Sequence, residues 1–374
     1  MLDPAEFFEC LRGARFDYFT GVPDSLLKDF CAYVSDHAGE QGHLISANEG
    51  AAVALAAGHY LATGRYGLVY MQNSGLGNAI NPLTSLADED VYSIPMLLLI
   101  GWRGEPGRPD EPQHVKQGKV TNGLLDCLGI PNAVLPQEMD GARALLIRAV
   151  THFERHSSPF AIVVSAGTFG KYEKRKDPDH HEMRREDAIK VIAGNLDVAD
   201  VIVATTGMTS RELFEHRATT GGRHSGDFLT VGSMGHASQI AMAIAQSRPD
   251  RQVVCLDGDG AAIMHLGSLA IIGTRAPSNF KHIIINNGAH DSVGGQPTAA
   301  QAIDLTAIAT ACGYRHVARV KLARDLAAAV SKLRKQDGPA LLEVLTNKGA
   351  RSDLGRPNVR PVDNKIGFMR NLLG

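Results

Sequence analysis

Short runs of aliphatic and β-branched residues alternate along this chain with longer, alanine-rich amphipathic stretches. A short apolar run bounded by turn residues is typical of a buried strand, and a longer stretch with a period near 3.6 residues predicts a helix. The strands predicted in this way are 67–71, 95–101, 160–165, 201–205, 252–256, 282–286 and 340–344. The clearest predicted helices are 49–63, 237–247 and 322–336. This alternation indicates parallel α/β sheets with crossover helices.

A change in composition divides the chain into two halves. Residues 171–187 (KYEKRKDPDHHEMRRED) mix acids and bases, contain one proline and have almost no apolar residues. Such a segment is typical of a solvated linker. A length of 374 residues also suits two hydrophobic cores better than one. We therefore expect two α/β domains with doubly wound parallel sheets, at 1–170 and 188–374.

Composition argues against several classes of protein. An apolar fraction of 44% and a net charge of -2 favour a soluble globular protein without bulk attraction to nucleic acid or to an anionic membrane. The longest apolar run, 94–102, contains a proline and is too short to span a bilayer. Asp3, Pro4 and Glu6 predict a helix start rather than a signal peptide. Five scattered cysteines without paired spacing favour free thiols and a reducing cytoplasm.

The strongest chemical signal lies in the second half. One predicted strand runs into Asp-Gly-Asp-Gly at 257–260, and the next runs into Asn-Asn-Gly at 286–288. In an open parallel sheet, ligands bind beyond the carboxyl ends of the strands. Glycine lets the backbone approach an anion, and a helix N-terminus favours phosphate oxygens. Because carboxylate and carboxamide oxygens suit Mg²⁺, these residues predict a diphosphate held through magnesium.

The spacing of this motif differs from that of common nucleotide sites. The chain has neither the G-x-G-x-x-G dinucleotide pattern nor a G-x-x-x-x-G-K-[ST] phosphate loop. Gly-Asp-Gly followed, after one helix and one strand, by Asn-Asn resembles the diphosphate motif of thiamine-diphosphate-dependent enzymes. The resemblance implies the thiamine-diphosphate-binding fold, with thiamine diphosphate and Mg²⁺ as cofactors. It implies Asp259, Asn287 and the carbonyl of Ala289 as metal ligands, with Asn286 as the alternative to Asn287. The diphosphate-loop residues implied beside them are Gly258, Gly260 and Ala261.

Two further segments of the second half resemble the same family. Gly232, Ser233 and Met234 resemble the segment that holds the aminopyrimidine ring, where Met234 is implied to keep the cofactor bent. An ordinary core side chain is the alternative for Met234. Gly207 and Thr209 resemble another turn near the diphosphate. The second half is therefore similar to a diphosphate-binding domain.

In the first half, Glu49 opens an alanine-rich helix. From the residues alone, a first-turn charge favoured by the helix dipole is the simpler interpretation. The resemblance implies instead the catalytic glutamate that protonates the pyrimidine ring, with a pKa raised by burial. The first half then corresponds to the pyrimidine-binding domain. Because sites of this family lie between subunits, the resemblance also implies a homodimer or larger homo-oligomer with an inactive monomer.

Four segments narrow the resemblance to the phosphonopyruvate decarboxylases, with the sulfopyruvate decarboxylases as the close alternative. These segments are 20–25 (TGVPDS), 101–107 (GWRGEPG), 110–114 (DEPQH) and 287–298 (NGAHDSVGGQPT). Both substrates are small anionic 2-oxo acids, so the pocket should supply donors and positive charge. The candidates for the substrate anion site are Ser25, Arg103, Lys116, Gln117 and Ser292.

Proton transfer requires a second set of groups. Beside Glu49, the candidates are Asp24, His114 and His290. A helix cap is the alternative for Asp24, and solvent-facing charges are the alternative for Arg103 and Lys116 in the anion set.

The implied reaction is non-oxidative decarboxylation of 3-phosphonopyruvate to phosphonoacetaldehyde and CO₂, through the cofactor's ylide and an enamine. Two other classes stay open. A non-catalytic thiamine-diphosphate-binding subunit would lack the glutamate that Glu49 supplies. An NAD-dependent dehydrogenase would need the dinucleotide pattern that the chain lacks.

Overall fold

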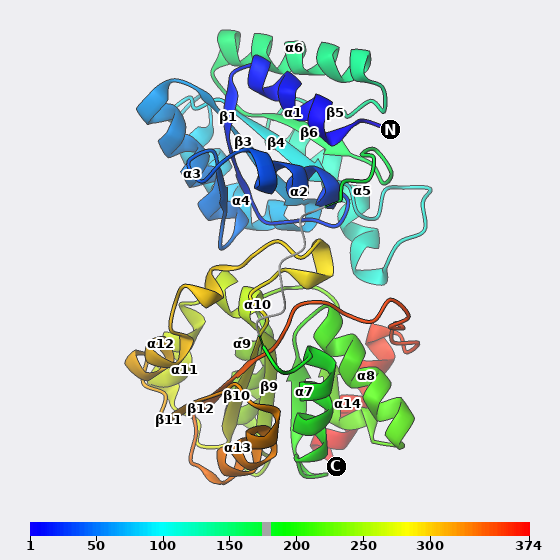
Figure 1. Cartoon of the computed structure of the whole chain (residues 1–374), viewed down its shortest axis with the longest axis vertical. Helices are drawn as coiled ribbons and strands as arrows, with labels where there is room; N and C mark the ends of the chain where they lie inside the picture. Colours follow the sequence, from blue (N-terminus) through cyan, green and yellow to red (C-terminus); the bar gives the residue numbers. More distant parts are fainter. Residues whose placement is uncertain (174–180) are drawn as a thin grey trace. The chain divides into compact units, whose positions relative to one another are not determined.

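The computed structural model of the chain describes residues 1–173 and 181–374. The chain forms two compact units, Met1–Asp177 and Pro178–Gly374, which are coloured from blue to green and from green to red in Figure 1. Part of the expected charged linker, residues 174–180, lies outside the described residues. Its expected C-terminal end differs from a solvated linker, because Arg185 is buried and begins a helix.

The first unit is a six-stranded parallel sheet with the strand order β2-β1-β3-β4-β6-β5. Its elements are α1 (Pro4–Gly13), β1 (Phe16–Gly21), α2 (Lys28–His37), β2 (His43–Ile45), α3 (Glu49–Thr63), β3 (Tyr66–Gln72), η1 (Asn73–Gly75), α4 (Leu76–Pro82), η2 (Leu83–Ala87), β4 (Met96–Gly101), α5 (Pro112–Cys127), β5 (Asn132–Val134), α6 (Met139–His156) and β6 (Phe160–Val164). As predicted, Asp3 caps α1, and its carboxylate accepts from the backbone N–H of Ala5 at 2.7 Å.

Helices cover both faces of this sheet (Figure 1). Leu68 and Tyr70 of β3 pack into a core with α1, α2 and α6. Val69 and Met71, which point to the opposite face, pack with α3, α4 and α5. Because both faces are covered, the central strands are continuous apolar runs rather than alternating ones. This unit is therefore doubly wound, as the sequence predicts.

The second unit is also a six-stranded parallel sheet, with the order β11-β12-β10-β9-β7-β8. Its elements are α7 (Arg185–Gly194), β7 (Val201–Ala204), α8 (Met208–Thr220), η3 (His224–Gly226), β8 (Asp227–Leu229), α9 (Ala237–Ser247), β9 (Val253–Gly258), α10 (Asp259–Met264), α11 (Ser268–Arg275), β10 (Phe280–Asn286), η4 (Asp291–Val293), η5 (Ala299–Gln301), α12 (Leu305–Ala311), β11 (His316–Val320), α13 (Ala323–Lys335), β12 (Ala340–Leu345) and α14 (Pro361–Leu373).

The two sheets share one topology. When the strands are numbered from 1 to 6 within each unit, both sheets read 2-1-3-4-6-5. In the second unit, α7, α8 and α13 pack on one face, and α9, α11, α12 and α14 pack on the other. Ligands of open parallel sheets bind beyond the carboxyl ends of the strands. We therefore expect the ligand-binding loops of the two units to follow corresponding strands. Within the described residues, no helix combines the length and the apolar character needed to cross a bilayer.

Candidate active site

Glu49 is positioned by the first turn of α3. The side chain of Asn48 caps this helix and accepts from the backbone N–H of Ala51 at 2.9 Å. The Glu49 carboxyl group is buried, and its Oε2 accepts from Asn78 Nδ2 at 2.8 Å. Gly75 approaches so closely that a β-carbon there would overlap the Glu49 carboxyl group. Burial raises the pKa of Glu49, although the Asn78 hydrogen bond opposes the shift, so this group holds a proton more readily than an exposed glutamate.

Asp24 lies just beyond β1 and is fully buried. Its carboxylate accepts from Gln72 Nε2 and from the backbone N–H of Leu26, both at 2.8 Å. Burial raises the Asp24 pKa, and these hydrogen bonds oppose the shift. The helix that follows, α2, begins only at Lys28, so Asp24 stabilises the preceding turn instead of capping the helix. A β-carbon at Gly101 would overlap this carboxylate, so any larger residue at the end of β4 would displace the Asp24 side chain.

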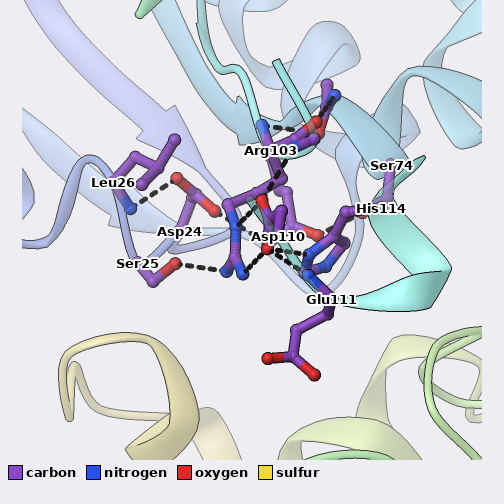
Figure 2. A network of polar contacts seen from close by, with 11 residues as sticks. Asp24, Ser25, Leu26, Ser74, Arg103, Asp110, Glu111 and His114 are labelled. Carbon is purple, nitrogen blue, oxygen red and sulfur yellow. Dashed lines mark hydrogen bonds and ion pairs between the residues drawn. The ribbon is translucent and has the colours of Figure 1, made fainter. Parts of the chain in front are cut away.

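Arg103, Asp110 and His114 form a polar network beside Asp24 (Figure 2). Asp110 accepts from Arg103 Nε at 2.9 Å and from Arg103 Nη2 at 2.5 Å. It also accepts from the backbone N–H groups of Gly104 and Glu111, both at 2.7 Å. Arg103 Nη1 donates to Ser25 Oγ at 2.9 Å, and His114 Nδ1 lies 2.9 Å from Asp110 Oδ1. The network therefore joins three of the residues predicted from the sequence: Ser25, Arg103 and His114.

Asp110 determines the proton positions in this network. Burial raises its pKa, but the hydrogen bonds from Arg103 and His114 outweigh burial and hold the pKa well below its usual range. An ionised carboxylate only accepts, so His114 Nδ1 carries the proton and Nε2 is the basic nitrogen. Burial lowers the pKa of His114, which favours this neutral form. Sequence reasoning did not select Asp110, although the residue lies in the DEPQH segment quoted above.

Two predicted anion-site residues lie further along α5. Lys116 is exposed, and Gln117 is half-buried with its backbone carbonyl accepting from Thr121 Oγ1 at 2.6 Å. Neither contributes a side-chain hydrogen bond to the Asp110 network within the described residues. Among the described residues, the Asp110 network thus includes the side chains of Arg103 and Ser25 but not those of Lys116 and Gln117.

In the second unit, the loops that follow β9 and β10 meet at Asp259. Asp259 begins α10 and is only 3% exposed. Its carboxylate accepts from Thr298 Oγ1 and from backbone N–H groups that include that of Asn287. Burial raises the Asp259 pKa to about 7 despite these hydrogen bonds. A buried carboxylate of this kind is readily stabilised in its charged form by a cation.

The two neighbouring asparagines have different roles. Asn286 Nδ2 donates to Glu343 Oε1 at 2.7 Å, which commits its side chain to β12. Asn287 Oδ1 accepts from the backbone N–H of Ala289 at 3.1 Å, and Nδ2 donates to Asp291 Oδ2 at 2.7 Å. Asn286 Oδ1 likewise accepts from the backbone N–H of Gly288 at 3.1 Å, so each amide oxygen keeps one lone pair. Asn287 differs in that its backbone N–H donates to the Asp259 carboxylate. Of the two asparagines, Asn287 is thus the one linked directly to Asp259.

His290 and Ser292 lie on the loop that continues from Asn287. The His290 ring is half-buried and packs against Gly260, where a β-carbon would lie 3.0 Å from Cε1. Burial lowers the His290 pKa to about 4, so the ring is neutral near pH 7. Ser292 is exposed, and its Oγ accepts from the backbone N–H of Met208 at 3.3 Å. Ser292 therefore contacts the α8 N-terminus, where Gly207 and Thr209 lie.

The remaining predicted cofactor residues occupy tight turns. Gly207 has φ 98°, and a β-carbon there would lie 2.5 Å from Ser292 Oγ. Thr209 is buried in the first turn of α8. Ser233 has φ 51°, which is unusual for a residue with a side chain, and lies between half-buried Gly232 and half-buried Met234. Backbone strain of this kind concentrates at ligand sites, and a half-buried methionine fits a ligand contact better than a packed core.

The donor set of the second unit fits the predicted cofactors. Asp259 and Asn287 offer hard oxygens, and Gly258 and Gly260 let backbone approach at the start of α10. Thr205 Oγ1, near Gly258, is buried and has no hydrogen-bond partner among the described residues, so it provides an unused polar atom at the same strand ends. These features suit a metal-bound diphosphate.

Comparisons with known proteins agree with this geometry. Residues 5–124 match the N-terminal thiamine pyrophosphate (TPP) binding domain of the thiamine pyrophosphate enzymes, and residues 205–344 match the C-terminal one. The chain is 36% identical to a phosphonopyruvate decarboxylase of Streptomyces hygroscopicus, with 96% of this chain and 92% of the relative covered. A phosphonopyruvate decarboxylase of Streptomyces viridochromogenes is 35% identical, with 97% and 93% covered. A sulfopyruvate decarboxylase of Methanosarcina acetivorans is 27% identical, with 96% and 94% covered.

Proposed function

The chain belongs to the thiamine-pyrophosphate-dependent enzymes, and on this premise we propose that it decarboxylates 3-phosphonopyruvate to phosphonoacetaldehyde and CO₂. The observation that carries the proposal is the near full-length similarity to two phosphonopyruvate decarboxylases, which exceeds the similarity to the sulfopyruvate decarboxylase. Glu49 supports an enzyme over a non-catalytic thiamine-diphosphate-binding subunit, because it is a buried carboxyl group with a raised pKa in the first unit.

The second unit supplies the residues that would hold the cofactor. We propose that Asp259, Asn287 and the Ala289 carbonyl bind Mg²⁺, and that this ion holds the diphosphate at the start of α10. We further propose that Gly232, Ser233 and Met234 contact the aminopyrimidine, and that Gly207 and Thr209 lie near the diphosphate. Bound thiamine diphosphate supplies a nucleophilic carbon and an electron sink.

The first unit supplies the groups that move protons and bind the substrate. Glu49 would give a proton to the pyrimidine ring, and its raised pKa makes the carboxyl group hold its proton more readily than an exposed glutamate does. Arg103 and Ser25 bind the anionic end of the substrate, with Asp110 keeping the guanidinium in one orientation. Because His114 Nδ1 carries its proton toward Asp110, Nε2 is the unprotonated, basic nitrogen. His114 Nε2 accepts or returns a proton after CO₂ leaves. Asp24 is the second group available for this step, and His290 is the third.

The direct test is CO₂ release by the purified chain from phosphonopyruvate and, separately, from sulfopyruvate. We expect release from phosphonopyruvate that requires both thiamine diphosphate and Mg²⁺. Release from sulfopyruvate alone would overturn the substrate and leave the chemistry intact. No release from either acid, with the cofactor bound, would overturn the proposed activity.

Assembly and location complete the proposal. We infer a homo-oligomer whose monomer is inactive, which light scattering combined with activity at increasing dilution would test. The described cysteines are free thiols, which supports a reducing compartment such as the cytoplasm.

A further inference from the structure

Arg185 is the buried centre of an ion-pair network in the second unit. The residue begins α7 and is 4% exposed. Its Nε and Nη2 donate to the two carboxylate oxygens of Glu212 at 2.8 and 2.9 Å. Its Nη1 donates to Asp291 Oδ2 at 2.5 Å, and Nη2 also lies 3.3 Å from the backbone carbonyl of Gly349. A guanidinium with fixed donors on three sides holds each of its partners in one place.

Asp291 passes this constraint on to Asn287. A single oxygen, Oδ2, accepts from Arg185, from the backbone N–H of Gly349 at 2.8 Å and from Asn287 Nδ2 at 2.7 Å. Asp291 is thus fixed from one side by a buried cation and a backbone group, and on the other side it faces the Asn287 amide.

The contact determines which end of the Asn287 amide is available. An ionised carboxylate can only accept and the Ala289 N–H can only donate, so both bonds are satisfied only when Nδ2 faces Asp291 and Oδ1 faces Ala289. If the amide rotated by half a turn, two acceptors would face each other at Asp291. Oxygen, and not nitrogen, is the atom that a magnesium ion binds.

We propose that Arg185 and Asp291 are positioning residues for the metal site, because they hold the oxygen of Asn287 ready for Mg²⁺. The proposal rests on the proposed function, in which Asn287 is a ligand, and adds two residues that do not touch the metal. Groups that orient a ligand in this way typically change metal affinity 10- to 100-fold when they are removed.

Asp291→Ala is the sharpest variant. It removes the acceptor for Asn287 Nδ2 and leaves Arg185 paired with both oxygens of Glu212, so no buried cation loses its last partner. The measurement is Mg²⁺ binding to the full chain saturated with thiamine diphosphate, by titration calorimetry. We expect the dissociation constant for Mg²⁺ to rise about 10- to 100-fold. Asp291→Asn keeps an oxygen that can accept from Nδ2 and should show a smaller loss.

A double-mutant cycle separates positioning from a general structural role. If Asp291 acts through Asn287, Asp291→Ala should change Mg²⁺ affinity little in an Asn287→Ala background, so the two effects are not additive. Additive effects would overturn the proposal. Glu215→Gln is the matched control, because it removes the charge that pairs with Arg351 and replaces one of the two oxygens that accept from Arg351 and the Gly355 N–H, without touching Asp291. A loss of Mg²⁺ affinity in that control equal to that of Asp291→Ala would also overturn it.

Asp259→Ala distinguishes this inference from the function on which it rests. If Asp259→Ala abolishes Mg²⁺ binding while Asp291→Ala leaves it unchanged, the metal site stands and the positioning role is wrong. If Asp259→Ala leaves Mg²⁺ binding intact, the proposed metal site is wrong, and the positioning role is overturned with it.

Discussion

The two units share a strand order but use the same strand ends for different chemistry. In the first unit, the residues after the third and fourth strands are linked by Asn73, whose Nδ2 donates to the Arg103 carbonyl at 2.8 Å. In the second unit, the equivalent loops are linked where the Asn287 N–H donates to the Asp259 carboxylate. The first pair of loops presents a guanidinium, and the second pair presents a carboxylate and an amide. The fold therefore provides the location, and the side chains decide which ligand each location suits.

Burial raises the pKa of one acid in each unit, but the two acids suit different roles. The pKa values of Glu49 and Asp259 are both raised by desolvation. Glu49 receives one side-chain hydrogen bond, from a neutral amide, and therefore suits a proton donor. Asp259 receives several hydrogen bonds, including one from the backbone N–H of Asn287, and therefore suits a cation. The expected consequences of removing each acid can be separated experimentally.

Glu49→Gln should give the largest effect. The amide preserves the shape of the side chain but has no acidic proton, so turnover should fall roughly 10²- to 10⁴-fold. The affinity for Mg²⁺ should stay close to that of the wild type, because this acid is not a metal ligand. Steady-state kinetics together with calorimetric cofactor binding would check both expectations. Near-native turnover would remove Glu49 from the proposed role.

Asp259→Asn should show the opposite pattern. Loss of the charged ligand should weaken Mg²⁺-dependent cofactor binding by more than about 100-fold, since even groups that only orient a ligand are worth 10- to 100-fold. Equilibrium dialysis with labelled thiamine diphosphate, with and without Mg²⁺, would measure this loss. Cofactor affinity equal to that of the wild type would contradict the contrast drawn between the two units.

Asp110→Asn tests the network of the first unit. In the wild type, Asp110 Oδ1 accepts from Arg103 Nη2 and His114 Nδ1, and Oδ2 accepts from Arg103 Nε. The amide replaces one of these oxygens with a donor and removes the negative charge, so Arg103 is no longer held at two points. A misplaced catalytic or binding group costs about 100-fold, and we expect kcat/KM for phosphonopyruvate to fall by that order. Glu105→Gln is the control, since it removes the partner of Arg108 in the same loop but leaves Arg103 paired. Equal losses in both variants would exclude a specific role for Asp110.

His43→Gln should give the smallest effect, on the stability of the first unit. Burial lowers the His43 pKa from about 6.5 to about 4, so the unfolded chain binds more protons between these two pH values. Stability is thus lost as pH falls through that window, by about 1.4 kcal/mol for each pH unit. Urea unfolding followed by the fluorescence of Trp102, the single tryptophan, should show a shallower pH dependence in His43→Gln. The same slope in both proteins would contradict the prediction.

The sequence predicts the parts of the fold and of the site that depend on local pattern. All seven predicted strands and three predicted helices are present, because each is a long apolar or amphipathic run. Five strands of the described part of the chain were missed. The strands β2, β5 and β8 have only three residues each. The strands β1 (FDYFTG) and β11 (HVARV) are longer but contain polar residues and are partly exposed, so neither is a continuous apolar run. Asp259 and Asn287 were identified because each directly follows a buried strand.

Residues that depend on distant partners could not be predicted in this way. Arg185 lies in a run of charges that is typical of a solvated segment. It is buried only because Glu212 and Asp291, 27 and 106 residues further along, neutralise it. Asp110 was overlooked for a related reason, since its role depends on Arg103, with which it pairs across a turn. A charge pattern read locally cannot show such pairings.

The self-contained sheets have a consequence for how a gene could encode this protein. Among the described residues, the strands of one sheet all precede Glu173 and those of the other all follow His181, and no strand of one sheet pairs with a strand of the other. Severing the backbone between those residues would break no strand pairing on either side. Two separate reading frames, one per unit, could therefore encode fragments that each retain a complete sheet.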